Sequence, residues 1–105
     1  MSLIIFCTCP DEVSANTIAG QLVKKHLAAC VNIVANISSV FRWENQIEKT
    51  SEYLLLIKST EENYAGIEAF IQSQHPYKTP EIIAVPIIKA SKDYLKWLSD
   101  AARIQ

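Results

Sequence analysis

The sequence predicts a single α+β domain, because short apolar runs rich in β-branched residues alternate with segments whose apolar residues recur at helical spacing. The expected order is strand, helix, strand, strand, helix, strand, helix. The chain has 105 residues, which is the length of one domain, and it shows no repeat, low-complexity tract or linker. We therefore treat residues 1–105 as one domain.

The first strand and the first helix are predicted from the N-terminal quarter of the chain. Residues 3–8 form a short apolar run that Pro10 ends, and Asp11 is the expected N-cap of the helix. The helix should continue to about Ala28, with His26 on its apolar stripe. The other apolar positions of this stripe are Ala15, Ile18, Ala19, Leu22 and Val23.

A long β-hairpin is expected across residues 30–58. Residues 53–57 are apolar on both faces, which favours a central strand, and the only turn signal between the two arms is a weak one at 44–46. Each arm would have about 12–14 residues, more than a usual strand. Arms of this length extend beyond a single layer of helices, and long exposed strand edges favour association. Half of the residues are hydrophobic, so we predict a homo-oligomer.

The second half of the chain should contain a helix, a loop, a strand and a last helix. Ser59 and Glu62 have the spacing of a capping box at the start of the helix. Two prolines make residues 74–80 a loop. The strand is expected at residues 81–88, where Pro86 requires an edge position or a bulge.

This order of elements predicts a ferredoxin-like sandwich with an added C-terminal helix, whose expected N-cap is Ser91. Two split β-α-β units give an antiparallel sheet with helices on one face. Right-handed crossovers place the strands in the order fourth, first, third, second. The first strand is then central, and the second lies at an edge.

The predicted topology brings two cysteines and a histidine to one end of the sheet. Cys7 and Cys9 are two residues apart on the first strand, so their side chains share a face. The loop with His75 lies at the same end, whereas Cys30 begins the second strand at the opposite end. Two thiols beside an imidazole can hold a soft metal such as Cu(I) or Zn. The alternative is that the thiols pack as small hydrophobic groups and that the loop histidine is simply hydrogen-bonded.

A second set of residues is a candidate lining for a ligand cavity between subunits. These residues are Trp43, Tyr77, Tyr94 and Trp97, with Lys58 and Glu81 at strand ends. Large aromatic side chains and a few polar groups are typical of such cavities. The alternative is that the aromatic residues anchor the core and an interface, and that the two charges are ordinary surface groups.

The composition argues against several classes of function. A net charge of −1 gives no basic surface for nucleic acid. No apolar run reaches the roughly 20 residues of a membrane span, and the first residues lack the basic region of a signal peptide, so we expect a cytoplasmic protein. Known catalytic motifs are absent, which favours a binding protein over an enzyme. In an enzyme the natural nucleophile would be Cys30, with His26 as a base that no third group orients.

Five segments, in order along the chain, form a recognisable pattern. They are Ala29-Cys30-Val31-Asn32-Ile33, Ser39-Val40-Phe41-Arg42-Trp43, residues 54–58, His75-Pro76-Tyr77-Lys78-Thr79-Pro80-Glu81-Ile82-Ile83 and Tyr94-Leu95-Lys96-Trp97-Leu98. With these segments, the chain resembles the CutA family of divalent-ion-tolerance proteins over nearly its whole length.

The resemblance implies a tight homotrimer with a ferredoxin-like fold, in which the hairpin of one subunit extends the sheet of its neighbour. It also implies a cytoplasmic protein linked to tolerance of copper and other divalent ions. Cys7 and His75 are then the candidate copper ligands, with Cys30 as the more widely shared cysteine. Clefts between subunits, similar to those of PII-like signalling proteins, leave a small-ligand sensor or a scaffold as alternatives.

The chain departs from the pattern of the family at three places. Ala35 and Asn36 stand where many members have Pro-Gly, and Asn45 replaces a common glycine at the hairpin turn. Asparagine tolerates the unusual backbone of a bulge or turn, so we expect both positions to be accommodated. Gln74 stands where some members have a second histidine, which removes one potential metal ligand.

Overall fold

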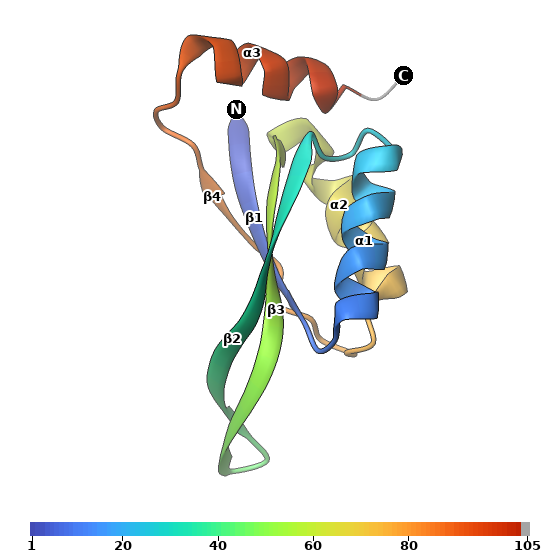
Figure 1. Cartoon of the computed structure of the whole chain (residues 1–105), viewed down its shortest axis with the longest axis vertical. Helices are drawn as coiled ribbons and strands as arrows, with labels where there is room; N and C mark the ends of the chain where they lie inside the picture. The colour runs from blue at the N-terminus through green and yellow to red at the C-terminus, as the bar shows by residue number, and fades with distance from the viewer. Residues whose placement is uncertain (104–105) are drawn as a thin grey trace.

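An antiparallel sheet of four strands carries two helices on one face and a third helix across one end (Figure 1). The computed structural model describes residues 1–103. Its elements are β1 (Ser2–Cys9), α1 (Glu12–Lys24), β2 (Cys30–Trp43), β3 (Gln46–Thr60), the short 3₁₀ helix η1 (Glu61–Asn63), α2 (Tyr64–Gln74), β4 (Ile83–Pro86) and α3 (Lys92–Ala101). The strand order β2-β3-β1-β4 is the predicted one, which confirms the ferredoxin-like fold.

Helix α1 begins as predicted but ends earlier. The Asp11 carboxylate accepts a hydrogen bond of 2.7 Å from the backbone N–H of Ser14, so Asp11 is the N-cap. The helix was expected to reach Ala28, but it ends at Lys24. His26 has a φ of 59°, and this left-handed conformation turns the chain out of the helix. The buried Ala28 then leads into β2.

The long hairpin is confirmed, with arms of 14 residues in β2 and 15 in β3. Between the paired positions Val34–Leu54 and Ile37–Glu52, β2 contains one residue more than β3. This bulge includes Asn36, whose φ of 58° is the unusual conformation expected there. The half of the hairpin beyond the bulge projects past the helices and gives the molecule its 45 Å length (Figure 1).

The hairpin turn consists of the two residues Glu44 and Asn45, whose φ values are 49° and 66°. Positive φ at both central residues is the signature of a type I′ turn, which suits the twist of the flanking strands. The weak turn signal in the sequence therefore marked the correct position. Asn45 occupies a left-handed position that asparagine tolerates better than most residues.

Two predictions for the second half of the chain are wrong in detail. Ser59 does not cap a helix. It belongs to β3, and its hydroxyl donates to the backbone carbonyl of Leu27. The last strand, expected at residues 81–88, covers only Ile83–Pro86, which is an edge position that tolerates Pro86. The predicted cap of α3 is confirmed, because the Ser91 hydroxyl accepts from the N–H of Tyr94 at 3.2 Å.

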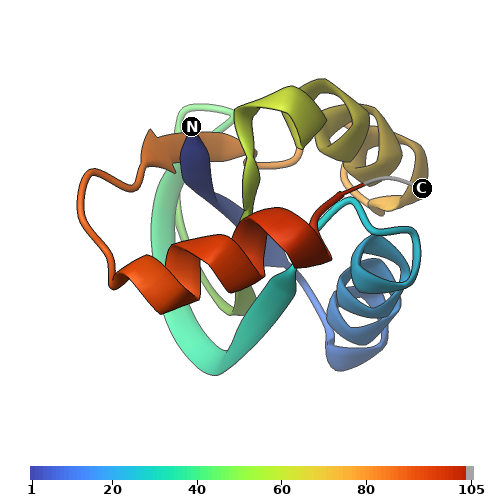
Figure 2. The same ribbon diagram turned by 90° about the horizontal axis from the view of Figure 1, so that it is seen from above.

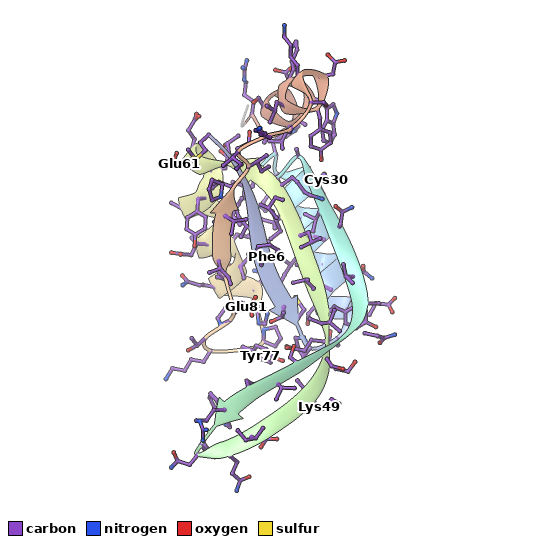
Figure 3. All side chains as sticks on the ribbon, turned by 90° about the vertical axis from the view of Figure 1, so that its left-hand side faces the viewer. Phe6, Cys30, Lys49, Glu61, Tyr77 and Glu81 are labelled. Carbon is purple, nitrogen blue, oxygen red and sulfur yellow. The ribbon has the colours of Figure 1, made fainter. Side chains whose placement is uncertain are left out.

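The core lies between the sheet and helices α1 and α2, which run side by side (Figure 2). Its fully buried side chains include Ile5, Cys7, Cys9, Ile18, Leu22, Leu55, Ile57, Ile67 and Ile71. Helix α3 crosses the end of the sheet and buries Leu98 in a smaller cluster. The opposite face of the sheet carries Phe6, and no helix of residues 1–103 covers it (Figure 3). The side chains that alternate onto this open face include Ile4, Phe6, Leu54, Leu56, Ile83 and Val85.

Candidate functional site

Cys7, Cys9 and His75 form a buried cluster at one end of the sheet, as the topology predicted. The two cysteines lie on the helix-covered face of β1 and are fully buried. His75 follows α2 directly, and only 8% of it is exposed. The sulfur atoms and a ring nitrogen of His75 all lie within 4.8 Å of one another. The two sulfur atoms and the nitrogen are therefore close enough to one another to be ligands of a single metal ion.

Both ring nitrogens of His75 already have hydrogen-bond partners. Nδ1 accepts a bond of 3.0 Å from the backbone N–H of Tyr77. Because Nδ1 accepts, the ring proton is on Nε2, which donates to the backbone carbonyl of Thr8 at 2.6 Å. These bonds hold a neutral imidazole in one tautomer. A metal ion can bind His75 only if it replaces one of these two bonds.

The two thiols of the cluster act as a coupled pair. Their mutual hydrogen bond raises the pKa of Cys7 and lowers the pKa of Cys9. Burial and the negative charges of Glu81 and Glu52 raise the pKa of Cys7 further. The pair therefore gives up a first proton from Cys9 much more readily than a second from Cys7. A bound cation would offset the negative charge that opposes the second ionisation.

Cys30 is not part of this cluster. It begins β2, where it pairs with Lys58, and Lys58 in turn lies opposite Ile4 near the start of β1. Cys7 and Cys9 lie at the other end of the same strand (Figure 3 labels Cys30). Within one chain, a site that joins Cys30 to Cys7 and His75 is therefore not formed. Cys9 occupies the third position instead.

A cleft of about 1100 Å³ lies between the projecting half of the hairpin and the loop after α2. Its lining residues are Thr8, Ser39, Val40, Phe41, Trp43, Glu48, Lys49, Thr50, Glu52, Pro76, Tyr77, Lys78, Thr79 and Glu81. Figure 3 shows Tyr77 and Glu81 on one side and Lys49 on the hairpin. Three of the six predicted cleft residues, Trp43, Tyr77 and Glu81, are in this lining.

The other three predicted cleft residues lie elsewhere in the chain. Lys58 is in the half of β3 that pairs with the start of β1. Tyr94 and Trp97 are on α3, with ring centroids 5.5 Å apart, so they pack on each other across the far end of the sheet. The prediction grouped these residues as the wall of a cavity between subunits. A single chain brings only half of them together.

Sequence reasoning missed Glu52, which is only 5% exposed although it lines the cleft. The hydroxyl of Tyr77 donates to its Oε2 at 2.8 Å. Burial and this hydrogen bond raise the pKa of Tyr77 to about 12. The available signal was the alternation of β3, where Glu52 shares a face with the apolar Leu54 and Leu56. A carboxylate in a row of apolar side chains indicates a buried position where it needs a hydrogen-bond donor.

The family model described as CutA1 divalent ion tolerance protein matches residues 3–101. A curated relative from Thermus thermophilus, named divalent-cation tolerance protein CutA, is 40% identical over 100 residues, which covers 95% of this chain and 97% of the relative. The solved CutA1 structure from Thermus thermophilus has a TM-score of 0.94 and covers 96% of this chain and 98% of its own. The Archaeoglobus fulgidus structure, named a periplasmic divalent cation tolerance protein, has a TM-score of 0.95 at 37% identity and covers 98% of this chain and all of its own.

None of these names states an enzymatic activity. No helix within residues 1–103 is long and apolar enough to cross a membrane. The sequence identity, the coverage and the shared sheet topology agree. The chain belongs to the CutA1 divalent ion tolerance protein family.

Proposed function

We propose that this protein serves in tolerance of divalent metal ions, copper first among them, by weak binding of the metal at Cys7, Cys9 and His75. The observation that supports this proposal most is the approach of two sulfur atoms and an imidazole nitrogen to within 4.8 Å in a buried setting. Thiolate and imidazole are the ligands that copper and zinc prefer. The family name supports the link to divalent cations.

The same geometry explains why the binding should be weak. The ion must displace thiol protons, and it must also replace one hydrogen bond of His75. The bond that is lost goes to Thr8 or to Tyr77, and both residues line the cleft. Occupation of the cluster would therefore alter the surface of the cleft. This gives a route from metal binding to a signal.

We further propose that the protein is a homotrimer. The open face of the sheet, which includes Ile4, Phe6 and Leu56, is apolar, and none of the helices in the described part of the chain covers it. Apolar faces of this kind are usually covered by another chain. The projecting hairpin offers a second contact surface with long strand edges. The number of three comes from the resemblance to the family.

A cytoplasmic location is proposed from the chemistry of the thiols. Cys7, Cys9 and Cys30 are all free cysteines, and two of them lie side by side in the core. Such pairs persist as thiols in a reducing compartment. The Archaeoglobus relative is named periplasmic, so cell fractionation of the native protein is the direct test. Recovery of the protein in the periplasm would contradict this proposal.

The metal site is tested by an anaerobic competition titration with Cu(I) and a chromogenic chelator. We expect about one copper per chain in the wild type, since the cluster forms one site. The Cys7→Ser/His75→Gln double variant should lose this copper, whereas Cys30→Ser, the matched control, should keep it. Size-exclusion chromatography of each variant checks the assembly. Equal affinity in the wild type and the double variant would refute the assignment.

A second candidate function is the sensing of a small ligand, with metal binding as an incidental property. The observation that favours it is the cleft of about 1100 Å³, which is large enough for a small molecule and includes three residues predicted from the sequence. Any ligand that binds only the folded protein must raise its thermal stability. A metabolite screen by thermal shift should then find a stabilising compound. A broad screen without any shift would remove this candidate.

A further inference from the structure

Cys7 and Cys9 form a dithiol, and a dithiol can give up electrons as well as bind a metal ion. We propose that this pair reduces Cu(II) to Cu(I) and is itself converted to an intrachain disulfide. The proposal rests on the metal site of the proposed function and extends it, because it adds a chemical reaction that depends on the oxidation state of the copper. Cu(I) binds to the reduced pair, whereas Cu(II) oxidises it.

The reaction balances for two copper ions per chain. Each thiol loses its proton, and the two sulfur atoms together give up two electrons as the bond between them forms. Each of the two Cu(II) ions accepts one of these electrons and becomes Cu(I). The two protons pass to the solvent. Copper is therefore the only oxidant that the reaction requires.

The spacing of the two cysteines allows this bond. Both side chains lie on the helix-covered face of β1, because residues two apart on a strand point the same way. A strand rises about 3.3 Å per residue, so the two Cα atoms are roughly 6.6 Å apart, near the upper end of the disulfide range of about 4.4–6.8 Å. The sulfur atoms share a hydrogen bond and lie within 4.8 Å of each other.

This end of β1 can adapt to the closer approach that the bond requires. A disulfide brings its sulfur atoms to about 2 Å, so the backbone between Cys7 and Cys9 must contract slightly. β3 pairs with β1 as far as Cys9, whereas β4 pairs with it only at Leu3–Phe6 among the described residues. The other edge is held by the hydrogen bond from His75 to the carbonyl of Thr8. A metal ion that takes Nε2 of His75 releases this bond and frees the backbone to move.

The rest of the chain offers no competing partner for either thiol. The sequence contains three cysteines, and the third, Cys30, pairs with Lys58 at the opposite end of the sheet. A disulfide within one chain is therefore possible only between Cys7 and Cys9. Neither of these cysteines exposes any surface, so a second chain cannot reach them without unfolding.

Burial of the pair also selects a small oxidant. The sulfur atoms are fully buried, and His75 beside them is only 8% exposed. A peptide disulfide is too bulky to reach thiols in such a setting. A metal ion needs only to replace one hydrogen bond of His75, whose imidazole is a good ligand for copper. The ion then lies beside the two sulfur atoms that reduce it.

The product of the reaction differs from the reduced cluster in its affinity for metal. Thiolate is a soft ligand that favours Cu(I), so the reduced pair stabilises the lower oxidation state as it forms. The disulfide no longer offers a thiolate, and His75 remains as the single ligand of the cluster. The oxidised protein should therefore release its copper as Cu(I).

The first experiment uses Cys30→Ser, which keeps the pair and removes the third thiol. Cu(II) is added in portions to the reduced protein without oxygen, and electron paramagnetic resonance measures the Cu(II) that remains. We expect about two Cu(II) ions per chain to lose their signal, since one disulfide supplies two electrons. Mass spectrometry should then find the peptide with Cys7 and Cys9 lighter by two hydrogen atoms. An undiminished Cu(II) signal, or a disulfide that joins two chains, would overturn the proposal.

The second experiment removes one thiol of the pair. The Cys9→Ala/Cys30→Ser variant keeps Cys7 and His75 but has no partner for a disulfide, so the Cu(II) signal should persist. A loss of signal equal to that in Cys30→Ser would refute the role of the pair. Circular dichroism and size-exclusion chromatography check the fold and the assembly of the variant. If it does not fold, the signal and the disulfide of Cys30→Ser decide.

Zn(II), which has no redox chemistry, separates this proposal from the metal site. Reduced Cys30→Ser should bind about one Zn(II) per chain, and the disulfide form should lose it. If Zn(II) or Cu(I) binds while Cu(II) keeps its signal, this inference fails and the proposed function stands. If Cu(II) is reduced but neither Zn(II) nor Cu(I) binds, the inference stands and metal binding fails. If no metal binds and no disulfide forms, both are refuted.

Discussion

The replacement of His75 by alanine tests the structural role of the thiol–imidazole cluster separately from its proposed role in metal binding. His75 is largely buried and makes one hydrogen bond to the carbonyl of Thr8 and one to the N–H of Tyr77. Each bond contributes about 1 kcal/mol to stability. The Thr8 carbonyl, which belongs to a buried residue, would keep only the weak hydrogen bond of 3.8 Å from the thiol of Cys7, at a cost of roughly 1 kcal/mol more. We therefore expect His75→Ala to lower the free energy of unfolding by about 3 kcal/mol in the absence of metal.

Urea unfolding at fixed protein concentration, followed by circular dichroism, measures this loss. Fixed concentration matters because the stability of an oligomer depends on it. His26→Asn is the matched control, since His26 is exposed and its left-handed conformation suits asparagine. The control should change stability by less than about 0.5 kcal/mol. A loss below about 1 kcal/mol in His75→Ala would show that the two hydrogen bonds do not hold the loop.

Three further predictions concern single side chains. Tyr77 should titrate at about pH 12 in ultraviolet absorbance, and Glu52→Gln should lower this pKa. Because folding raises the pKa of Tyr77, the stability that Tyr77 contributes is present below pH 10 and is lost as the pH rises through 12. Asn36→Ala should lower the free energy of unfolding by about 1 kcal/mol in urea, while Asn36→Gly should not, because φ is 58°. Asn63→Ala should cost about 2 kcal/mol in the same assay, because its amide donates to the carbonyls of Leu27 and Ala102. A pKa of about 10 for Tyr77 would contradict the first prediction. Equal free energies of unfolding for the two Asn36 variants would contradict the second, and an unchanged urea midpoint for Asn63→Ala would contradict the third.

The fold could be predicted from the sequence because its main signals are local. Apolar periodicity placed the strands and helices, and the Asp11 and Ser91 caps are short-range interactions. Asn36 and Asn45 were expected at unusual backbone positions, and both have positive φ. The rule of right-handed crossovers then brought Cys9 and His75 to the same end of the sheet.

The errors arise where tertiary contacts override local patterns. Ser59 has the spacing of a helix cap, but its hydroxyl donates a hydrogen bond to the carbonyl of Leu27, which is distant in the sequence. His26 fits the apolar stripe of α1, yet the chain must turn there to enter β2. Glu52 looks like a surface charge, because its burial depends on the loop that brings Tyr77 over it. Sequence spacing contains no information on these long-range partners.

The candidate site was predictable in its composition but not in its bonding. Cys7 and His75 could be placed together from the topology, whereas the hydrogen bonds that occupy both ring nitrogens of His75 could not. The same limit applies to the cleft. The sequence indicated Trp43 and Tyr77, but it grouped them with side chains such as Trp97, which the fold places on α3.

Native mass spectrometry of the untagged protein, before and after the addition of stoichiometric copper, tests the central claim most directly. We predict a trimer that takes up about one copper per chain, and a Cys7→Ser/His75→Gln trimer that takes up none, since thiolate and imidazole are the proposed ligands. A trimer that takes up no more copper than the double variant would contradict the metal site and would leave the cleft as the functional region. A monomer would contradict the assembly inferred from the projecting hairpin and the open apolar face.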